Sequence, residues 1–143
     1  MKISTKGRYG LRALIDLAIN MESENVSIKA ISERQSISER YLEQIFSLLR
    51  KAGIILGRKG AQGGYILGKE PKDLPIIDIL KVLEGDSIFI DINDKEENDL
   101  EIFINKNLWK DINLIIRDYF TSITLEDLVD NYKKSKDNII YYI

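Results

Sequence analysis

The sequence predicts a mainly α-helical fold that carries one small β-hairpin. Apolar residues recur at three-and-four spacing in several separate stretches of the 143-residue chain, which is typical of amphipathic helices. One glycine-rich segment, "GRKGAQGGYIL" (residues 57–67), lies between two short β-compatible runs. With 44% hydrophobic residues, the chain can bury one or two small cores.

The first helix is predicted in "STKGRYGLRALIDLAINM", residues 4–21. Its apolar stripe consists of Leu11, Leu14, Ile15, Leu17, Ala18 and Met21. The side chains expected to face solvent are Lys6, Arg8, Arg12 and Asp16. This pattern indicates an amphipathic helix that packs on one face only.

Two more helices follow, separated by a short break at residues 35–37. Ser27 is the expected N-cap of the first helix and Ser38 that of the second, which ends at Gly53. The second helix has apolar positions at Leu42, Ile45, Phe46 and Leu49 and a polar face of Glu39, Arg40, Glu43, Gln44 and Ser47. This is the outline of a helix-turn-helix, although similar helix pairs occur throughout all-helical proteins.

The glycine-rich segment then predicts a β-hairpin formed by residues 54–56 and 65–67. Arg58 and Lys59 lie in its loop, and the glycines permit positive φ angles and close backbone approach. A cationic hairpin directly after a helix-turn-helix is the layout of a winged helix, whose hairpin reaches phosphates or the minor groove. The alternative is a plain glycine-rich turn that happens to be basic.

Charge divides the chain into two parts. Residues 1–72 hold 13 lysines and arginines against 7 acidic residues, a net charge of +6, whereas residues 73–143 hold 8 against 16, a net charge of −8. A basic front part suggests contact with a polyanion, most plausibly nucleic acid. We therefore predict a winged helix-turn-helix domain over 1–72 and a second functional part over 73–143.

The second part begins with a linker and a short helix near Pro75 that ends at Gly85, with apolar residues on more than one face. A helix of about 22 residues then follows the acidic loop. Its apolar residues at helical spacing are Leu100, Phe103, Ile104, Leu108, Ile112, Ile115, Ile116 and Tyr119. Because few other apolar elements are available to cover them, we expect a symmetric dimer; packing within the chain is the alternative.

The C-terminal stretch predicts one last short helix. Thr124 and Asp127 in "TLEDLVDNY" have the spacing of a capping box. We interpret "KKSKDN" as a charged spacer before the apolar end "IIYYI".

The composition excludes several function classes. Cysteine and histidine are absent, which removes disulfides, thiolate and imidazole catalysis, and thiolate-held iron-sulfur clusters. The acidic run "DINDKEENDLE" has Lys95 in place of a calcium-loop glycine and is interpreted as a solvated loop. We expect no enzyme activity, metal or cofactor, and, without a signal segment or membrane span, a cytoplasmic protein.

The segments "ISTKGRYGLRALIDLA", "ISERQSISERYLEQIFSLLRKAG" and "GRKGAQGGYILGKEP" resemble the IscR- and CymR-type winged-helix regulators of bacteria, the Rrf2 family, over residues 1–85. This resemblance implies a homodimer on double-stranded DNA, with the 38–51 helix in the major groove and the wing in the minor groove. It assigns base contacts to Arg40, Glu43 and Gln44, a chemistry that fits guanine, cytosine and adenine respectively. The residues expected to contact DNA are Lys6, Arg8, Ser38, Arg40, Tyr41, Glu43, Gln44, Arg50, Arg58, Lys59, Gly60, Gly63 and Gly64.

The chain departs from the family pattern in two places. Lys59 stands where the family usually has arginine, so we assign the wing role to Arg58 and Lys59 jointly. Cluster-binding members carry three cysteines in the loop that corresponds to residues 86–107, and this chain has none, which excludes the cluster.

The rear part resembles CymR-type cysteine-metabolism repressors of Gram-positive bacteria, through "TLEDL" and the terminal Tyr141, Tyr142 and Ile143. This implies a repressor of cysteine or sulfur genes on a pseudo-palindromic operator, whose tail binds cysteine synthase. Tail packing against the long helix is the alternative. The other functions considered are a regulator of a different set of genes and a protein-interaction module that does not read DNA.

Overall fold

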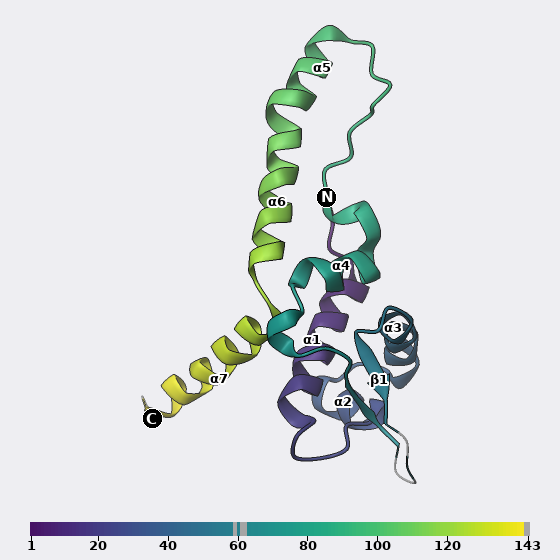
Figure 1. The fold of residues 1–143 in the computed structure, drawn as a ribbon, viewed down its shortest axis with the longest axis vertical. Coiled ribbons are helices and arrows are strands. Elements are labelled where there is room, and N and C mark those ends of the chain that lie inside the picture. The colour runs from purple at the N-terminus through teal and green to yellow at the C-terminus, as the bar shows by residue number, and fades with distance from the viewer. Residues whose placement is uncertain (59, 61–62, 142–143) are drawn as a thin grey trace.

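The computed structural model describes residues 1–58, 60 and 63–141; the side chains of 138–141 lie outside this description, as do residues 59, 61–62 and 142–143 (Figure 1). Seven α-helices and one antiparallel hairpin form the described chain, which confirms the predicted fold class. In chain order the elements are α1 (Thr5–Asn20), α2 (Ile28–Gln35), α3 (Glu39–Lys51), β1 (Ile55–Gly57), β2 (Tyr65–Leu67), the 3-10 turn η1 (Pro71–Asp73), α4 (Ile76–Glu84), the 3-10 turn η2 (Gly85–Ile88), α5 (Asp99–Ile104), the π-helical turn η3 (Asn105–Trp109), α6 (Lys110–Ser122) and α7 (Leu125–Tyr141).

The predicted helix boundaries in the front part are confirmed. The Ser27 side chain accepts a hydrogen bond from the Ala30 amide (3.0 Å), and Ser38 accepts one from the Tyr41 amide (3.1 Å), so both serines cap as expected. The turn between α2 and α3 places Ser36 at φ 56°, in the left-handed region. This left-handed residue ends α2 and lets the chain turn into α3.

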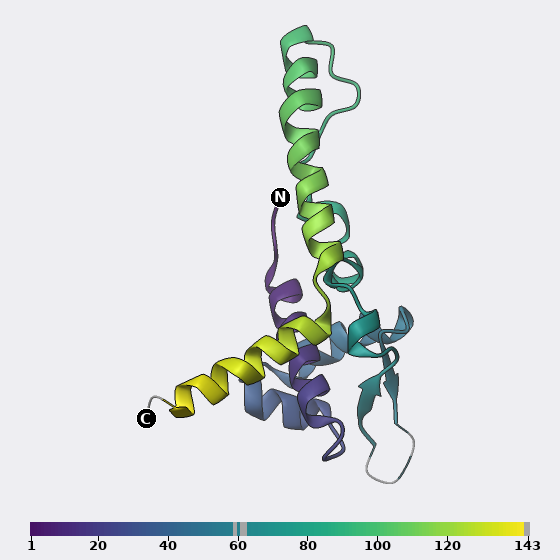
Figure 2. The same cartoon turned by 60° about the vertical axis from the view of Figure 1, so that its left-hand side comes forward.

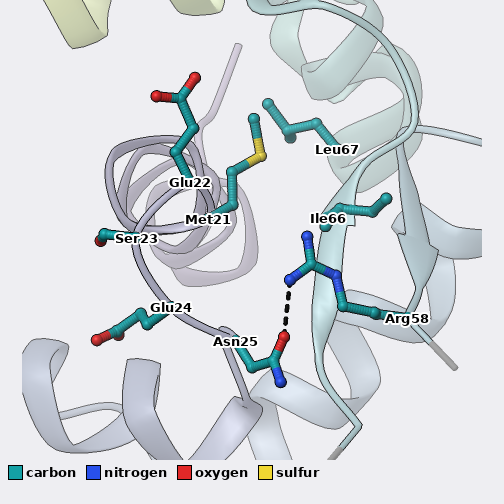
Figure 3. A pocket seen from close by; sticks show the side chains of 8 residues that line it. All are labelled: Met21, Glu22, Ser23, Glu24, Asn25, Arg58, Ile66 and Leu67. Carbon is teal, nitrogen blue, oxygen red and sulfur yellow. Dashed lines mark hydrogen bonds between the residues drawn. The ribbon is translucent and has the colours of Figure 1, made fainter. Parts of the chain in front are cut away.

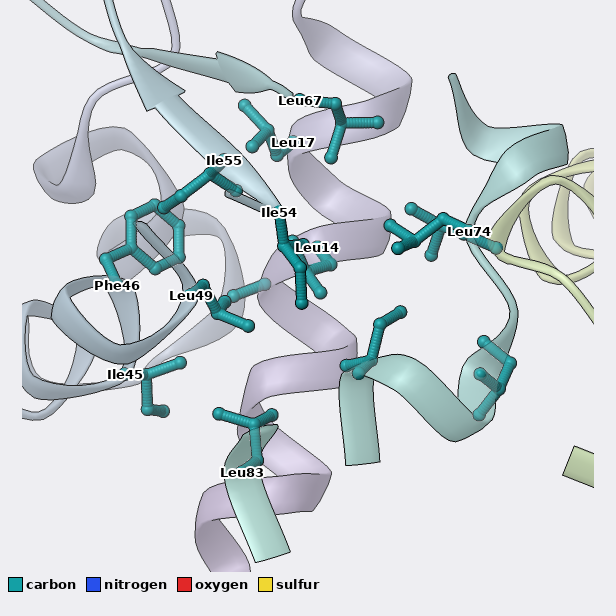
Figure 4. Packing of buried hydrophobic residues seen from close by; sticks show 14 of the residues in the cluster. Leu14, Leu17, Ile45, Phe46, Leu49, Ile54, Ile55, Leu67, Leu74 and Leu83 are labelled. Carbon is teal, nitrogen blue, oxygen red and sulfur yellow. The ribbon is translucent and has the colours of Figure 1, made fainter. Parts of the chain in front are cut away.

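One core joins the front part to the beginning of the rear part. Figure 4 shows side chains of α1, α3 and β1 meeting Leu74 and Leu83. Leu125 and Val129 of α7 belong to the same buried cluster. The core therefore extends across residue 72, and the division into domains at that residue stays a prediction.

Asp16 corrects the sequence-based interpretation of α1. It was expected to face solvent, but the residue is only 4% exposed. Its carboxylate accepts hydrogen bonds from the Arg34 guanidinium at 2.7 to 3.2 Å and from the Gln35 amide at 2.9 Å. The hydrogen bonds to Asp16 and its charge, together with those of Glu24, raise the pKa of Arg34 above its ordinary value, although partial burial opposes the shift. The pair joins α1 to α2, which the period of α1 alone could not reveal.

The predicted charged spacer near the C-terminus is wrong. Helix α7 continues through "KKSKDN" to Tyr141 instead of ending after a short run. The capping box at its start is confirmed, because the Thr124 amide donates to Asp127 (3.0 Å) and the Asp127 amide donates to the Thr124 hydroxyl (3.2 Å). Lysine, aspartate and asparagine are tolerated on an exposed helix, so their charge does not end α7.

The predicted long helix is confirmed, with one interruption. Residues 99–122 run as α5, η3 and α6, and we call this continuous segment the arm. Both views show the arm projecting away from the rest of the chain, with α7 leaving its base in another direction (Figures 1 and 2). No helix of the described residues has the length and apolar character to span a membrane.

Candidate nucleic-acid interface

Helix α3 has two chemically different faces. Leu42, Ile45, Phe46 and Leu49 are buried in the core. Arg40, Glu43 and Gln44 are exposed on the other side. This helix therefore presents hydrogen-bond donors and acceptors to solvent, which are the groups that can contact base edges.

Two shallow hollows flank the exposed edge of α3. One, of about 550 Å³, brings Lys6 at the start of α1 together with Arg40 and Gln44. The other, of about 230 Å³, brings Arg50 together with Tyr65 at the start of β2. Glu43 and Ser47 line both hollows. The edge of α3 is thus a ridge between the start of α1 and the hairpin, and it brings the predicted contact residues of α3 together with Lys6 of α1.

The start of α1 is held by a carboxylate from α4. Glu84 accepts hydrogen bonds from the amides of Ser4 and Gly7, both at 2.9 Å, and from the Ser4 hydroxyl at 2.6 Å. Burial raises the pKa of Glu84, but the hydrogen bonds from Ser4, Gly7 and Ser87 outweigh this effect, so the pKa lies below its ordinary value. The exposed cations Lys6 and Arg8 therefore lie on the first turn of α1, which these hydrogen bonds hold in place.

Tyr41 is half-buried, in contrast to its exposed neighbour Arg40. Its ring meets Tyr9 of α1 edge to face, with centroids 5.7 Å apart. The guanidinium of Arg12 lies 5.0 Å from the centre of the Tyr9 ring and donates to the Gln35 carbonyl. Sequence reasoning did not identify Tyr9, whose position on the helix gives no sign that it braces α1 against α3.

The hairpin forms from the predicted residues, except that its first strand is shifted by one position. β1 begins at Ile55, one residue later than expected, and Leu56 pairs with Ile66. The amide of Tyr65 donates to the Val26 carbonyl at 2.8 Å, so the loop between α1 and α2 supports the hairpin at the loop end of its strands. A side chain at Gly64 would meet the Val26 carbonyl oxygen at 3.1 Å, and its φ of 127° also favours glycine.

Arg58 is held at the base of the wing. Its guanidinium donates to the Asn25 side chain at 2.7 Å (Figure 3). The remaining guanidinium donors are available to a phosphate. Of the other predicted wing residues, Gly60 and Gly63 have positive φ, and Lys59 lies outside the described residues. Sequence reasoning missed Asn25, because a contact across 33 residues leaves no local signal.

In the described part of the chain, the cations of this face make no ion pair with a carboxylate. Within the described part of the chain, both ion pairs involve Arg34. Lys6, Arg40, Arg50 and Arg58 therefore remain unneutralised, which is the electrostatic requirement for contact with phosphates. Glu43 is likewise free of an ion pair, so its carboxylate is available to a base edge.

The helix-turn-helix, the supported hairpin and the unpaired cations define the described chain as a winged helix-turn-helix protein. Residues 3–131 match the Rrf2 family, described as an iron-dependent transcriptional regulator. The HTH-type transcriptional regulator CymR of Bacillus subtilis strain 168 is 39% identical over 143 residues, which cover 100% of both chains. The chain belongs to the Rrf2 family and is a transcriptional regulator rather than an enzyme.

Solved structures agree with this assignment. The structure of CymR, the global cysteine regulator of B. subtilis, has a TM-score of 0.79 and 40% identity, covering 92% of this chain and 98% of that chain. IscR of T. potens has a TM-score of 0.76 and 41% identity, covering 94% and 90% respectively. These matches confirm the predicted resemblance and the winged-helix fold.

The iron in the family description does not fit the residues of this chain. The sequence contains no cysteine and no histidine, so it lacks the thiolate and imidazole ligands of clusters and most iron sites. No group of three or more acidic residues that could hold a metal ion occurs among the described residues.

Proposed function

We propose that the chain is a cytoplasmic homodimeric repressor that reads a pseudo-palindromic operator and controls genes of cysteine or sulfur metabolism. The observation that carries the DNA-binding role is the ridge of α3 between Lys6 and Tyr65, with Arg40, Glu43 and Gln44 exposed along it. A ridge of this kind enters the major groove, while cations on either side meet phosphates.

The exposed apolar side chains of the arm support the homodimer. Leu100, Phe103, Leu108, Ile115 and Tyr119 are between 46% and 67% exposed. Ile104, Ile112 and Ile116 are half-buried. An apolar surface of this length is rarely left to solvent on a monomer, and a twin helix with the same stripe covers it by two-fold symmetry.

The π-helical turn favours the same interface. In an uninterrupted α-helix, residues twelve apart lie roughly 120° apart around the axis. A π turn accommodates one extra residue and brings them back to the same side. Because η3 lies between them, Phe103 aligns with Ile115 and Ile104 aligns with Ile116. The turn thereby makes one continuous stripe from two helices.

The proposed set of genes rests on the relatives. The chain is alignable over its whole length with CymR of B. subtilis, which is described as a global cysteine regulator. Tyr141, Tyr142 and Ile143 are the proposed docking residues for cysteine synthase. Helix α7 carries this end away from the core, which suits capture by a second protein, although Tyr142 and Ile143 lie outside the described residues.

The test is to sequence genomic fragments retained by the purified protein, with and without cysteine synthase from the same organism. We expect promoters of cysteine and sulfur genes, retained more tightly with the enzyme. Retention of other promoters, unaffected by the enzyme, would contradict only the proposed control of cysteine and sulfur genes. Failure to retain any DNA would favour an interaction module.

Two variants separate base reading from phosphate contact. Gln44→Ala should relax preference at one base position, by about 1 to 3 kcal/mol. Lys6→Gln should weaken binding to all sequences and reduce the salt slope by about 1. If both variants weaken all sequences equally, α3 is not the recognition helix.

A further inference from the structure

A cavity of about 940 Å³ lies between residues 86–94 and α6, on the opposite part of the chain from the α3 ridge. Its volume falls in the range of small-molecule sites. Lys2 is among its lining residues, and the segment after η2 forms one wall. Neither the winged helix nor the stripe of the arm uses this space.

The wall of the cavity is already ordered. The Asn113 side chain accepts a hydrogen bond from the Ile90 amide (2.7 Å) and donates one to the Ile90 carbonyl (3.0 Å). The guanidinium of Arg117 lies over the Phe89 ring, 5.3 Å from its centre. Two side chains of α6 therefore hold the opposite wall in place, which lowers the entropy that a ligand would lose on binding.

The lining combines an apolar surface with charges of both signs. The apolar members are Phe89, Ile90, Ile92 and Leu114. The charged members are Lys2, Lys110, Arg117, Asp86, Asp91 and Asp94. None of these six makes an ion pair, since both ion pairs of the described residues involve Arg34. A ligand of one charge would meet repulsion from half of them, whereas a zwitterion can pair with both signs.

We propose that this cavity binds a zwitterionic α-amino acid with a large apolar side chain. Arg117 and Lys110 are the cations for its carboxylate. Asp91 and Asp94 are the acids for its ammonium group, and Ile92 and the exposed Leu114 receive its side chain.

The cavity and the proposed dimer stripe use different sides of α6. Successive residues of α6 are about 100° apart, so Lys110 and Arg117 lie roughly 140° to 160° around the helix from Ile115. No residue of the proposed dimer stripe lines the cavity. The two surfaces of α6 can therefore be occupied together.

A chain of hydrogen bonds leads from the cavity to the start of α1. The Lys2 amide donates to the Ser87 carbonyl at 2.8 Å, and the Ser87 hydroxyl donates to the Glu84 carbonyl at 2.9 Å. The Glu84 carboxylate in turn holds Ser4 and Gly7. A ligand that bridges Asp91 and α6 braces the segment that follows Ser87 in this chain of contacts. Its occupancy therefore strengthens DNA binding; this second step rests on the proposed function.

The binding step is tested without DNA, by titration calorimetry of the full chain with L-phenylalanine. Phenethylamine and hydrocinnamate are the matched probes, because each keeps the ring and only one of the two charges. We expect L-phenylalanine to bind with a Kd between about 0.01 and 1 mM, and each analogue at least about tenfold more weakly. No saturable binding up to about 10 mM, or equal binding of an analogue, would overturn the proposal.

Variants locate the site. Arg117→Gln and Asp91→Asn should each weaken L-phenylalanine binding at least about tenfold, whereas Lys134→Gln on the exposed face of α7 should leave it unchanged. Circular dichroism of each variant verifies folding, and Asp91→Asn provides a second result if Arg117→Gln is unstable. Unchanged binding in both cavity variants would place the ligand elsewhere.

The coupling step is tested by DNA affinity with and without saturating L-phenylalanine. An increase of about fivefold or more is expected. Ligand binding with no change in DNA affinity would overturn the coupling and retain the site. Loss of all DNA binding in both conditions would contradict the proposed function instead, while the calorimetry would still decide the site.

Discussion

The apolar residues in the core of the winged helix are buried, whereas those of the arm are exposed. In the core, Leu14, Ile45 and Phe46 are at most 1% exposed, and the chain covers them by itself. In the arm, Phe103 and Ile115 remain more than 60% exposed. The first region buries its apolar residues within one chain, and the second leaves them exposed, as the proposed dimer requires. If that proposal holds, folding and association depend on separate sets of residues, which variants can distinguish.

The largest expected effect is on association. Ile115→Asp removes an apolar side chain and adds a carboxylate twice in a symmetric dimer, so we expect a loss of about 3 kcal/mol or more, over a hundredfold in dimer affinity. Sedimentation equilibrium measures this. Thr121→Asp, which places the same charge on another side of α6, is the control and should remain dimeric. A dimeric Ile115→Asp variant would mean that the arm does not form the interface.

A smaller effect is expected in the core region, on stability rather than on association. Asp16→Asn keeps the side-chain size but leaves the Arg34 guanidinium without its buried carboxylate. Because Arg34 retains partial contact with solvent, we expect a loss of about 2 kcal/mol in the free energy of unfolding. Urea denaturation measures this. Glu33→Gln on exposed α2 is the control, within about 0.5 kcal/mol of the wild type.

Glu84 of α4, which holds the start of α1, should make the stability of the protein depend on pH. The folded-state pKa of Glu84 is lowered, so its contribution is present above the unfolded value of 4.5 and is lost as pH falls through the folded pKa. Glu84→Gln should therefore lower stability by about 1 kcal/mol at neutral pH. The difference from the wild type should shrink as pH falls below 4.5, and a difference that grows there would contradict the assigned sign.

The smallest expected effect concerns the wing. Asn25→Asp gives Arg58 a carboxylate partner and neutralises it, which should reduce the salt slope of DNA binding by about 0.9. Asn25→Ala should weaken binding about twofold, because Arg58 loses its support. Fluorescence anisotropy at several salt concentrations measures both, with Ser23→Ala in the same loop as control. An unchanged slope in Asn25→Asp would show that Arg58 does not contact phosphate.

The sequence predicted those features that depend on neighbouring residues. The caps at Ser27 and Ser38, the glycine stop at Gly53 and the capping box at Thr124 all follow from local hydrogen bonds or φ angles. They are confirmed because each is decided within about four residues of chain.

Features decided by distant contacts were missed. The burial of Asp16 depends on Arg34, 18 residues away, and the placement of Arg58 depends on Asn25, 33 residues away. The π turn in the arm leaves no clear local signal either. The length of α7 was missed for another reason: charge was interpreted as a spacer, although charged residues on an exposed helix do not end it.

Hydroxyl-radical footprinting on a retained genomic fragment tests the central claim most directly, because it reports both the recognition face and its duplication by the arm. We expect two protected stretches on one face of the duplex, separated by about 10 base pairs or a multiple of that spacing. A single protected stretch, unchanged in Ile115→Asp, would contradict a dimer that reads two half-sites.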